Sequence, residues 1–374
     1  MKIEAVEPIL AGSWLFVHVH TDTGLTGLGE AGLWGYPEAS LAVLERFRDY
    51  LVGQDPLKIE HHSQYLYRNN HFRGAAVCGA IGAIDIALWD IMGKHYDAPA
   101  YQLMGGACRD RVRVYMHVNG GGSADNLVSS AQAAVDKGYT AVRFTPFPPG
   151  FQDLRYDALL DHIVGKVAAL REAMGKGVDL CVEMHRRLGP PETVALAREL
   201  EPFRPFFLED PILPDSPAVM GEVAKKCRIP IATGERLHTL FEFRELLEAG
   251  GAQYVRADVC LAGGLTHSKK IAALAESFHV GVIPHNPLSP VSTAACVQLD
   301  ACIPNFVLQE YTGENRPPKS DVLKKPLDMV DGHLIVPDAP GIGVELNVDA
   351  MKQLPFKPKS SATPLRVDGS VADK

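Results

Sequence analysis

Three glutamates recur at equal spacing through the middle of the chain. Glu183, Glu209 and Glu235 are each separated from the next by 26 positions, and each follows a short apolar run. One strand–helix unit of a parallel sheet has about this length, so the three side chains should emerge on one face. Converging carboxylates repel one another unless a cation lies between them, and an all-oxygen ligand set favours Mg²⁺ or Mn²⁺ over Zn²⁺. The spacing therefore predicts a divalent-metal site.

A similar spacing, of 23, 27 and 25 positions, continues through three further polar residues, Asp258, His285 and Glu310. Asp258 and His285 should end neighbouring strands, where the carboxylate can orient the imidazole and raise its basicity. His185 comes two residues after Glu183, so its side chain should point to the same side of the strand. These residues are candidates for proton transfer beside the metal.

Most of the other histidines are expected to be ordinary surface or core residues. His238, three positions after Glu235, stays open between that interpretation and a place in the pocket. The histidines without a predicted role are His18, His20, His61, His62, His95, His117, His162, His267, His279 and His333.

Short apolar strands alternate with amphipathic helices from Arg111 onward, which indicates an α/β fold built from right-handed parallel units. Eight such units predict a barrel of the TIM type. The rival, an open doubly wound sheet, usually carries a GxGxxG turn after its first strand, and the sequence has none there. The predicted strands are Val112–Val118, Thr140–Thr145, Val178–Glu183, Pro205–Glu209, Pro230–Glu235, Tyr254–Asp258, Val280–His285 and Phe306–Glu310.

The first third of the chain has a different pattern, with two alternating strands followed by helices. We expect an α+β domain over residues 1–110, the barrel with its active site over 111–336, and a C-terminal segment, 337–374, that packs back on the first domain. The predicted elements of the first domain are strands Lys2–Leu10 and Trp14–Thr21 and helices Pro37–Leu51, Pro56–Asn69 and Ala75–His95.

The composition of the chain limits the classes of molecule that the protein is expected to bind and the compartment in which it is expected to occur. The chain has 37 basic and 45 acidic residues and a net charge of −8, which disfavours nucleic acid as a ligand but allows a small anion. No uninterrupted apolar run reaches the length of a membrane helix, and the N-terminus does not resemble a signal peptide. The seven cysteines show no CxxC pair and are expected to be reduced. We expect a cytoplasmic protein and a homo-oligomer.

Several segments together resemble the mandelate racemase-like branch of the enolase superfamily, and the resemblance covers almost the whole chain. The matching segments are Asp85-Ile-Ala-Leu-Trp-Asp90-Ile-Met-Gly-Lys94, Leu103-Met-Gly-Gly106, Leu208-Glu-Asp-Pro211, Gly234-Glu-Arg236, Ala262-Gly-Gly264, Pro284-His285 and Val307-Leu-Gln-Glu310.

The resemblance implies a TIM-like (β/α)7β barrel with an N-terminal α+β capping domain. It also implies that Mg²⁺ is held by Glu183, Glu209 and Glu235. His285 paired with Asp258 would be the base and His185 the acid, and Glu310 would hydrogen-bond the metal-bound carboxylate of the substrate. Two positions depart from the pattern: Glu183 stands where related enzymes more often have Asp, and Asp210 where a second Glu is common.

The second barrel strand separates the reactions of this family. Racemases and cycloisomerases resemble one another in a Lys-x-Lys there, whereas this chain has Arg143, which is always protonated and cannot be a base. This favours a sugar-acid dehydratase that forms a 2-keto-3-deoxy acid, with galactonate as the first choice of substrate. Two alternatives stay open: an epimerase that uses His185 and His285 on opposite faces, and a catalytically silent protein that binds a metal or a sugar acid.

Overall fold

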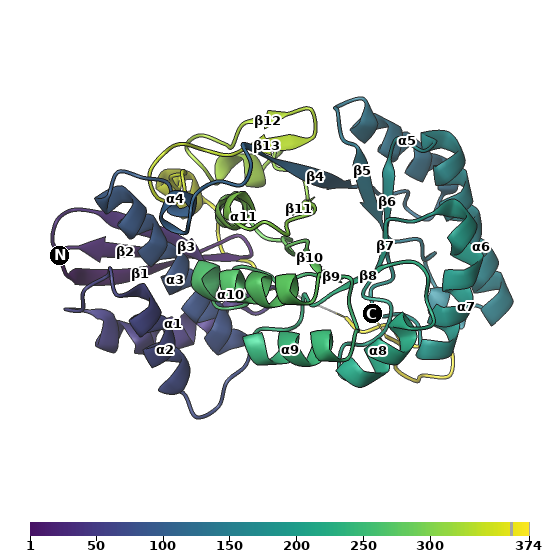
Figure 1. The fold of residues 1–374 in the computed structure, drawn as a ribbon, viewed down its shortest axis with the longest axis horizontal. Coiled ribbons are helices and arrows are strands. Elements are labelled where there is room, and N and C mark those ends of the chain that lie inside the picture. Colours follow the sequence, from purple (N-terminus) through teal and green to yellow (C-terminus); the bar gives the residue numbers. More distant parts are fainter. Residues whose placement is uncertain (360–361, 374) are drawn as a thin grey trace.

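Eight parallel strands form a ring in the larger part of the molecule, as Figure 1 shows. This computed structural model describes residues 1–359 and 362–373. Strands β4 to β10 pair in chain order, β11 pairs with β4, and a bridge between Val282 and Phe306 joins the last two. The predicted barrel is therefore confirmed. Its strands are β4 (Arg111–His117), β5 (Ala141–Phe144), β6 (Asp179–Glu183), β7 (Phe207–Glu209), β8 (Ile231–Thr233), β9 (Tyr254–Val255), β10 (Gly281–Val282) and β11 (Gln309–Tyr311).

The later strands are shorter than the sequence pattern predicts. Strand β8 ends at Thr233, because Gly234 has a φ of 128°, so Glu235 lies in the turn beyond the strand. Strands β9 and β10 have two residues each, but a further parallel bridge pairs Asp258 with His285. The segments that carry Asp258 and His285 therefore stay side by side, although the regular ladder between β9 and β10 ends before these two residues.

Side chains, not a channel, fill the interior of the ring. The innermost group is buried and takes members from seven of the eight strands or their direct extensions, so the barrel has a packed floor beneath its polar rim. The residues of this layer are Tyr115, Ala141, Cys181, Phe207, Ala232, Ile283 and Leu308.

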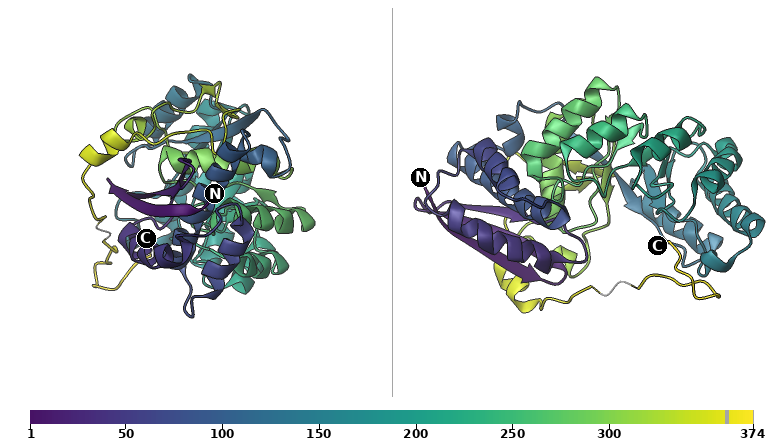
Figure 2. Two further views of the ribbon diagram at one scale, coloured as in Figure 1. Left: turned by 90° about the vertical axis from the view of Figure 1, so that its left-hand side faces the viewer. Right: turned by 90° about the horizontal axis from the view of Figure 1, so that it is seen from below.

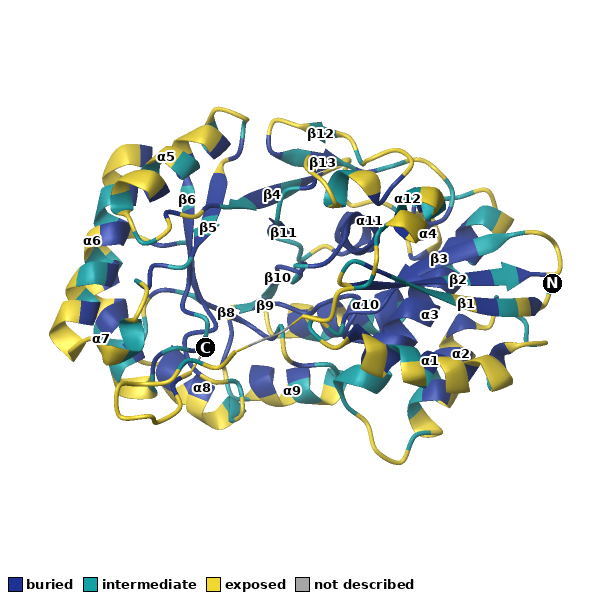
Figure 3. Cartoon of the chain, turned by 180° about the vertical axis from the view of Figure 1, so that it is seen from behind, coloured by how far each residue is buried: buried dark blue, intermediate teal, exposed yellow. Residues whose placement is uncertain are grey.

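Seven helices surround the ring, and Figure 3 shows their exposed faces turned outward and their buried faces turned to the strands. Polar residues start several of them: the Ser123 hydroxyl accepts from Asn126, and Thr239 forms a reciprocal capping box with Glu242. The helices are α5 (Ala124–Val135), α6 (Tyr156–Met174), α7 (Pro190–Leu200), α8 (Pro217–Ala224), α9 (Leu240–Glu248), α10 (Gly264–Ser277) and α11 (Pro290–Cys302).

The N-terminal part is a three-stranded antiparallel sheet packed on helices. Gly27 and Gly29 let strand β3 lie directly on helix α3, because a Cβ atom at either position would come within 2.0 Å of a carbonyl oxygen of that helix. The elements are β1 (Ile3–Ala11), β2 (Trp14–Thr21), β3 (Thr26–Glu30), α1 (Pro37–Leu51), α2 (Ile59–Arg68), α3 (Ala75–His95) and α4 (Ala100–Leu103).

Helix α3 differs from the expectation that no segment has the length and apolar composition of a membrane helix. Of the described helices, this one is long and apolar enough to cross a membrane by length and composition, despite Asp85. In the structure, 72% of its most apolar window is buried inside the protein. We therefore interpret α3 as a core helix.

Three buried carboxylates join this part to the rest of the chain, two of them to the barrel and one to the C-terminal segment. Glu30 accepts hydrogen bonds from Ser289 and Ser292 at the start of α11. Asp85 accepts from the backbone of Thr266 in α10. Asp90 accepts from the backbone of Leu28 and Ile342 and from the Lys94 ammonium. Asp85, Asp90 and Lys94 of the family-like segment therefore hold the fold together.

The C-terminal region contacts both parts of the molecule. Strands β12 (Met329–Val330) and β13 (His333–Ile335) form a hairpin that pairs antiparallel with β4, and α12 (Val348–Gln353) contacts β1. The tail beyond α12 then runs along the molecule, as Figure 2 shows, and Val367 donates to Asp153 in the loop after β5. The boundaries at residues 110 and 336 stay a prediction.

Candidate active site

Three strand-end glutamates converge at the carboxyl end of the barrel. Glu183 and Glu209 are direct neighbours in the β6–β7 ladder, and Glu235 follows β8. One carboxylate oxygen from each lies within 4.8 Å of the others, and all three side chains are at least nine-tenths buried. Burial of three like charges at this distance is unfavourable unless positive charge compensates them.

Three arginines supply positive charge around this triad. Arg143 lies 3.2 Å from Glu209 and also contacts Glu183. Arg256 is fully buried and lies 2.9 Å from Glu209, and Arg186 lies 2.6 Å from Glu235. Burial alone would raise the pKa of Glu235, but His285 and Arg186 hold it down at about 2. Glu235 is therefore ionised in these surroundings.

The two positions that depart from the family pattern have definite places. The long side chain of Glu183 folds back so that one oxygen accepts from the backbone N–H of His185 at 2.6 Å. Asp210 lies behind the triad, where it accepts from Thr233 and pairs with Arg186. Asp210 therefore positions an arginine beside Glu235.

His285 and Asp258 form a close pair. The Nδ1 atom of His285 lies 2.9 Å from an Asp258 oxygen, whose second oxygen accepts from the backbone of Leu261. The Nε2 atom of His285 lies 3.5 Å from Glu235 and so faces the triad. Burial opposes its charge, but Glu235, Glu310 and Asp258 together raise the pKa of His285 to about 9. The carboxylate thus fixes one ring nitrogen and leaves the other directed at the triad.

His185 approaches the triad from β6, with a backbone φ of 50° that only a constrained turn holds in a non-glycine residue. Its Nε2 atom lies 2.9 Å from Arg186, and its buried Nδ1 atom has no hydrogen-bond partner in the described protein. Burial, and next Arg186, lower the pKa of His185 to about 4. An acid role for this ring therefore requires Arg186 to move away from it.

Glu310 anchors the far side of the pocket. One of its oxygens accepts from Arg256 at 2.6 Å and from the backbone of Asn286 at 2.8 Å, and the other lies 2.8 Å from His117. His117 stacks on Tyr115, the preceding inward residue of β4. His117 was predicted to be an ordinary surface or core residue. This prediction was wrong, because its ring lies against Glu310.

The cations beside the triad were not predicted from sequence. Arg143 was considered only as a residue that cannot be a base, and Arg186 and Arg256 were not singled out. A signal was present, because residues two apart on a strand share a face. Counting back two positions from Asp258 gives Arg256, and the same step from His117 gives Tyr115.

His238 lies outside the triad. Its ring is 3.4 Å from Glu242, the residue that completes the capping box of α9. It also lines a separate cavity between α2, α3 and the loops before α9 and α10. All seven cysteines are free, as expected.

The donor set of the triad fits a divalent cation. Its oxygens come from three ionisable carboxylates, which are the ligands that hard cations prefer, and no imidazole or thiolate takes part in the triad. The guanidinium groups of Arg143, Arg186 and Arg256 now supply charge that such a cation would provide.

Known protein families match both parts of the chain. The N-terminal domain model of mandelate racemase and muconate lactonizing enzyme matches residues 4–105, and the enolase C-terminal domain-like model matches residues 126–350. A D-galactonate dehydratase of Xanthomonas campestris is 38% identical over 97% of both chains. One from Variovorax paradoxus is 36% identical over the same shares.

Solved structures agree with these matches. An enolase from Agrobacterium radiobacter, provisionally named a galactarate dehydratase and containing sodium and L-malate, superposes with a TM-score of 0.96 at 30% identity over 100% of both chains. A mandelate racemase/muconate lactonizing enzyme from Jannaschia has a TM-score of 0.90 at 32% identity, over 96% of this chain and 99% of that one.

Proposed function

This chain belongs to the enolase superfamily, in the branch of mandelate racemase and muconate lactonizing enzyme, and on that premise we propose that it is a Mg²⁺-dependent sugar-acid dehydratase. D-galactonate is the proposed first substrate, because several relatives between 36% and 39% identical carry that activity in their names. The observation that carries the proposal is the His285–Asp258 pair directed at three convergent carboxylates.

Glu183, Glu209 and Glu235 would hold the cation, and Mg²⁺ suits their oxygen atoms. Bound there, the cation would polarise the substrate carboxylate and stabilise the negative charge that develops when the neighbouring proton leaves. The chain would add positive charge through Arg256, which donates to Glu310. Burial would raise the pKa of Glu310, but Arg256 and His285 hold it well below its usual value, so Glu310 would have to gain a proton before it could donate to the substrate carboxylate.

Two histidines would carry the protons. In its neutral form, which a pKa of about 9 favours only in alkaline solution, His285 takes the proton from C2 at its Nε2 atom, because Asp258 occupies Nδ1. His185 gives a proton to the hydroxyl leaving C3, so the C3–O bond breaks and water departs. The enol that remains becomes the 2-keto-3-deoxy acid when its C2 hydroxyl loses a proton and C3 gains one, and the proton taken by His285 offsets the proton given by His185. Atoms and charge balance without a redox partner.

The two alternatives make different demands on the same residues. An epimerase needs His185 to return a proton to C2, and its product keeps every hydroxyl group. A silent binding protein needs no base, so a buried Asp258 oriented on His285 would serve no purpose in it. Formation of a 2-keto acid separates dehydration from both.

An aldaric acid is a second candidate substrate, supported by one cation of the pocket rim. Arg187 stacks over Phe147 and Phe151, and no ion pair joins it to a carboxylate of the described residues. A partly buried cation of this kind suits a second, distal carboxylate. Substitution Arg187→Gln should then raise KM for galactarate and leave KM for galactonate nearly unchanged.

The test is a screen of aldonic and aldaric acids for 2-keto acid formation with Mg²⁺ present. We expect turnover of galactonate or a near epimer. Epimerised product without 2-keto acid would favour the epimerase, and no change in any acid of the screen would favour the silent protein. Homo-oligomer formation and cytoplasmic location also stay predictions.

A further inference from the structure

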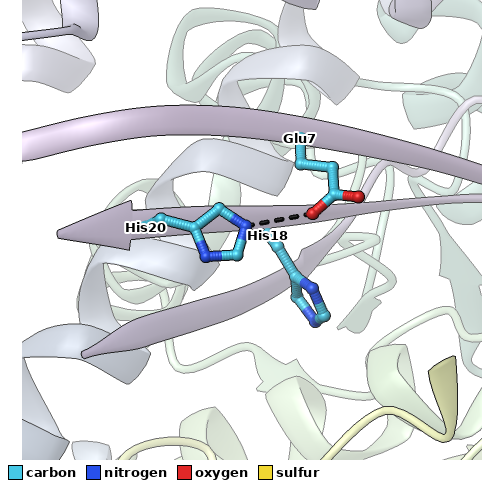
Figure 4. A group of neighbouring side chains, drawn as sticks. All are labelled: Glu7, His18 and His20. Atoms are coloured by element: carbon cyan, nitrogen blue, oxygen red, sulfur yellow. Dashed lines mark hydrogen bonds and ion pairs between the residues drawn. The ribbon is translucent and has the colours of Figure 1, made fainter. Parts of the chain in front are cut away.

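A second group of side chains that could bind a metal lies on the N-terminal sheet β1–β3, away from the carboxyl end of the barrel. Glu7 of β1 pairs directly with His18 of β2, and His20 follows two positions later on the same face. One ligand atom from each lies within 4.8 Å of the others. Figure 4 shows the three side chains gathered on the two strands. His18 and His20 were expected to have no role.

The chemistry of this group differs from that of the glutamate triad. Two imidazole nitrogens and one carboxylate oxygen are ligands for Zn²⁺ and related transition metals, whereas Mg²⁺ prefers oxygen alone. We propose that Glu7, His18 and His20 form a second cation site that takes Zn²⁺, with solvent as the fourth ligand. Nothing in this proposal depends on the reaction of the barrel.

His20 is already oriented for this task. Its Nδ1 atom lies 3.0 Å from the Thr26 hydroxyl on β3, and its Nε2 atom lies 3.0 Å from Glu7. Thr26 pairs directly with His20 in the β2–β3 ladder, so the sheet itself sets the contact. A hydrogen bond at the second nitrogen is the usual way in which proteins fix a metal-binding histidine.

His18 could bind a metal without first giving up a hydrogen bond to another residue that the structure describes. Its ring makes an edge contact with His20 at 5.8 Å between centroids, and no hydrogen bond ties it to any residue that the structure describes.

The charges around the site are compatible with a cation. Glu7 contributes one negative charge directly. Lys94 is the neighbouring positive group, but its ammonium is paired with Asp90 at 2.6 Å. A simple surface pair of Glu7 and His20 would account for one contact, but not for the ligand atom of His18 within 4.8 Å of both. The metal site accounts for all three.

The test is a competition titration of Zn²⁺ against a chromophoric chelator, with saturating Mg²⁺ present so that the glutamate triad is filled. We expect one Zn²⁺ per chain. His18→Gln and His20→Gln should each weaken binding more than about tenfold, because loss even of an outer partner costs about 10–100-fold. The matched control is His95→Gln, which changes an exposed histidine of the same domain.

Thr26→Val provides a second readout, because it keeps strand propensity while it removes the hydroxyl beside His20. It should weaken Zn²⁺ binding about tenfold with no change in the melting temperature of the metal-free protein. X-ray absorption of the Zn²⁺ complex should show two imidazole ligands. Equal affinity in wild type, His18→Gln and His20→Gln would overturn the proposal, as would no Zn²⁺ binding or binding abolished by Glu209→Gln.

Discussion

Two sets of buried carboxylates occupy this molecule, and their partners differ. At the contact between the capping domain and the barrel, the oxygens of Glu30 accept from backbone N–H groups and a serine hydroxyl. At the barrel rim, Glu209 and Glu235 meet arginine side chains and one another. Neutral donors from the backbone and one serine make Glu30 part of the structure, whereas charged arginine side chains compensate the convergent carboxylates of the rim.

The difference gives a criterion for function that burial does not provide. Burial of a carboxylate is unfavourable in both regions. A carboxylate whose oxygens already accept hydrogen bonds from fixed donors offers no free oxygen to a ligand. A site that meets it by crowding three arginines around three glutamates suits a divalent cation. Changes at the rim should therefore affect chemistry, and changes at the domain contact should affect stability.

The largest expected effect follows from removal of the proposed base. His285→Asn should lower turnover by about 10⁴-fold or more and should also stop exchange of the C2 proton with solvent deuterium. His185→Asn should stop elimination yet leave that exchange, because the proton can be removed without a leaving-group acid. Deuterium incorporation followed by NMR measures both. Exchange that survives in the first variant and disappears in the second would reverse the two roles.

A somewhat smaller loss is expected at the carboxylate behind the base. Asp258→Asn keeps the shape beside His285 but removes the charge and can fix the wrong tautomer, so turnover should fall by about 10²–10⁴-fold. Mg²⁺ affinity should change little, because Asp258 is outside the triad. Near-normal turnover would make Asp258 a plain rim residue, and lost Mg²⁺ affinity would make it a ligand.

The domain contact should respond in the opposite way. Glu30→Gln should lower the free energy of unfolding by about 1–3 kcal/mol, because the amide cannot satisfy every donor that faces Glu30. Turnover per folded molecule should stay within a few-fold of wild type. The matched control is Glu345→Gln, in an exposed pair with Lys324, which should cost less than about 1 kcal/mol. Urea unfolding measures both, and a large loss of turnover in folded Glu30→Gln would break the comparison.

The last prediction concerns the pH dependence of stability at the same residue. Burial raises the pKa of Glu30 from 4.5 to about 8, so the folded protein binds this proton more tightly than the unfolded chain. The stability that the proton contributes is present below pH 4.5 and is lost as pH rises through 8. The stability difference between wild type and Glu30→Gln should therefore narrow from pH 5 to pH 8. A difference that widens over this range would contradict the assignment.

Sequence alone predicted the parts of the molecule that depend on periodicity. Equal spacing of Glu183 and Glu209 reflects a repeated strand–helix unit, and β6 and β7 end at these two residues. The turn that carries Glu235 beyond β8 depends on the unusual φ of Gly234, which spacing does not reveal.

Contacts between distant segments were harder to predict. Glu30 and Ser289 are 259 positions apart, and Arg256 reaches Glu310 across the barrel floor. Both contacts depend on closure of the ring and on how the capping domain lies against it, and neither follows from local pattern. The position of Arg256 two residues before Asp258 places it on the inward face, but its partners Glu209 and Glu310 could not be predicted from local pattern.

The most direct test of the account is a calorimetric titration of Glu209→Gln with Mg²⁺, beside wild type and with thermal unfolding of both proteins. The substitution is nearly isosteric and removes the charge shared by Arg143 and Arg256. The account predicts that the variant folds, that its Mg²⁺ affinity falls strongly and that dehydration is lost. Wild-type Mg²⁺ affinity in a folded Glu209→Gln variant would contradict the metal triad and the dehydratase built on it.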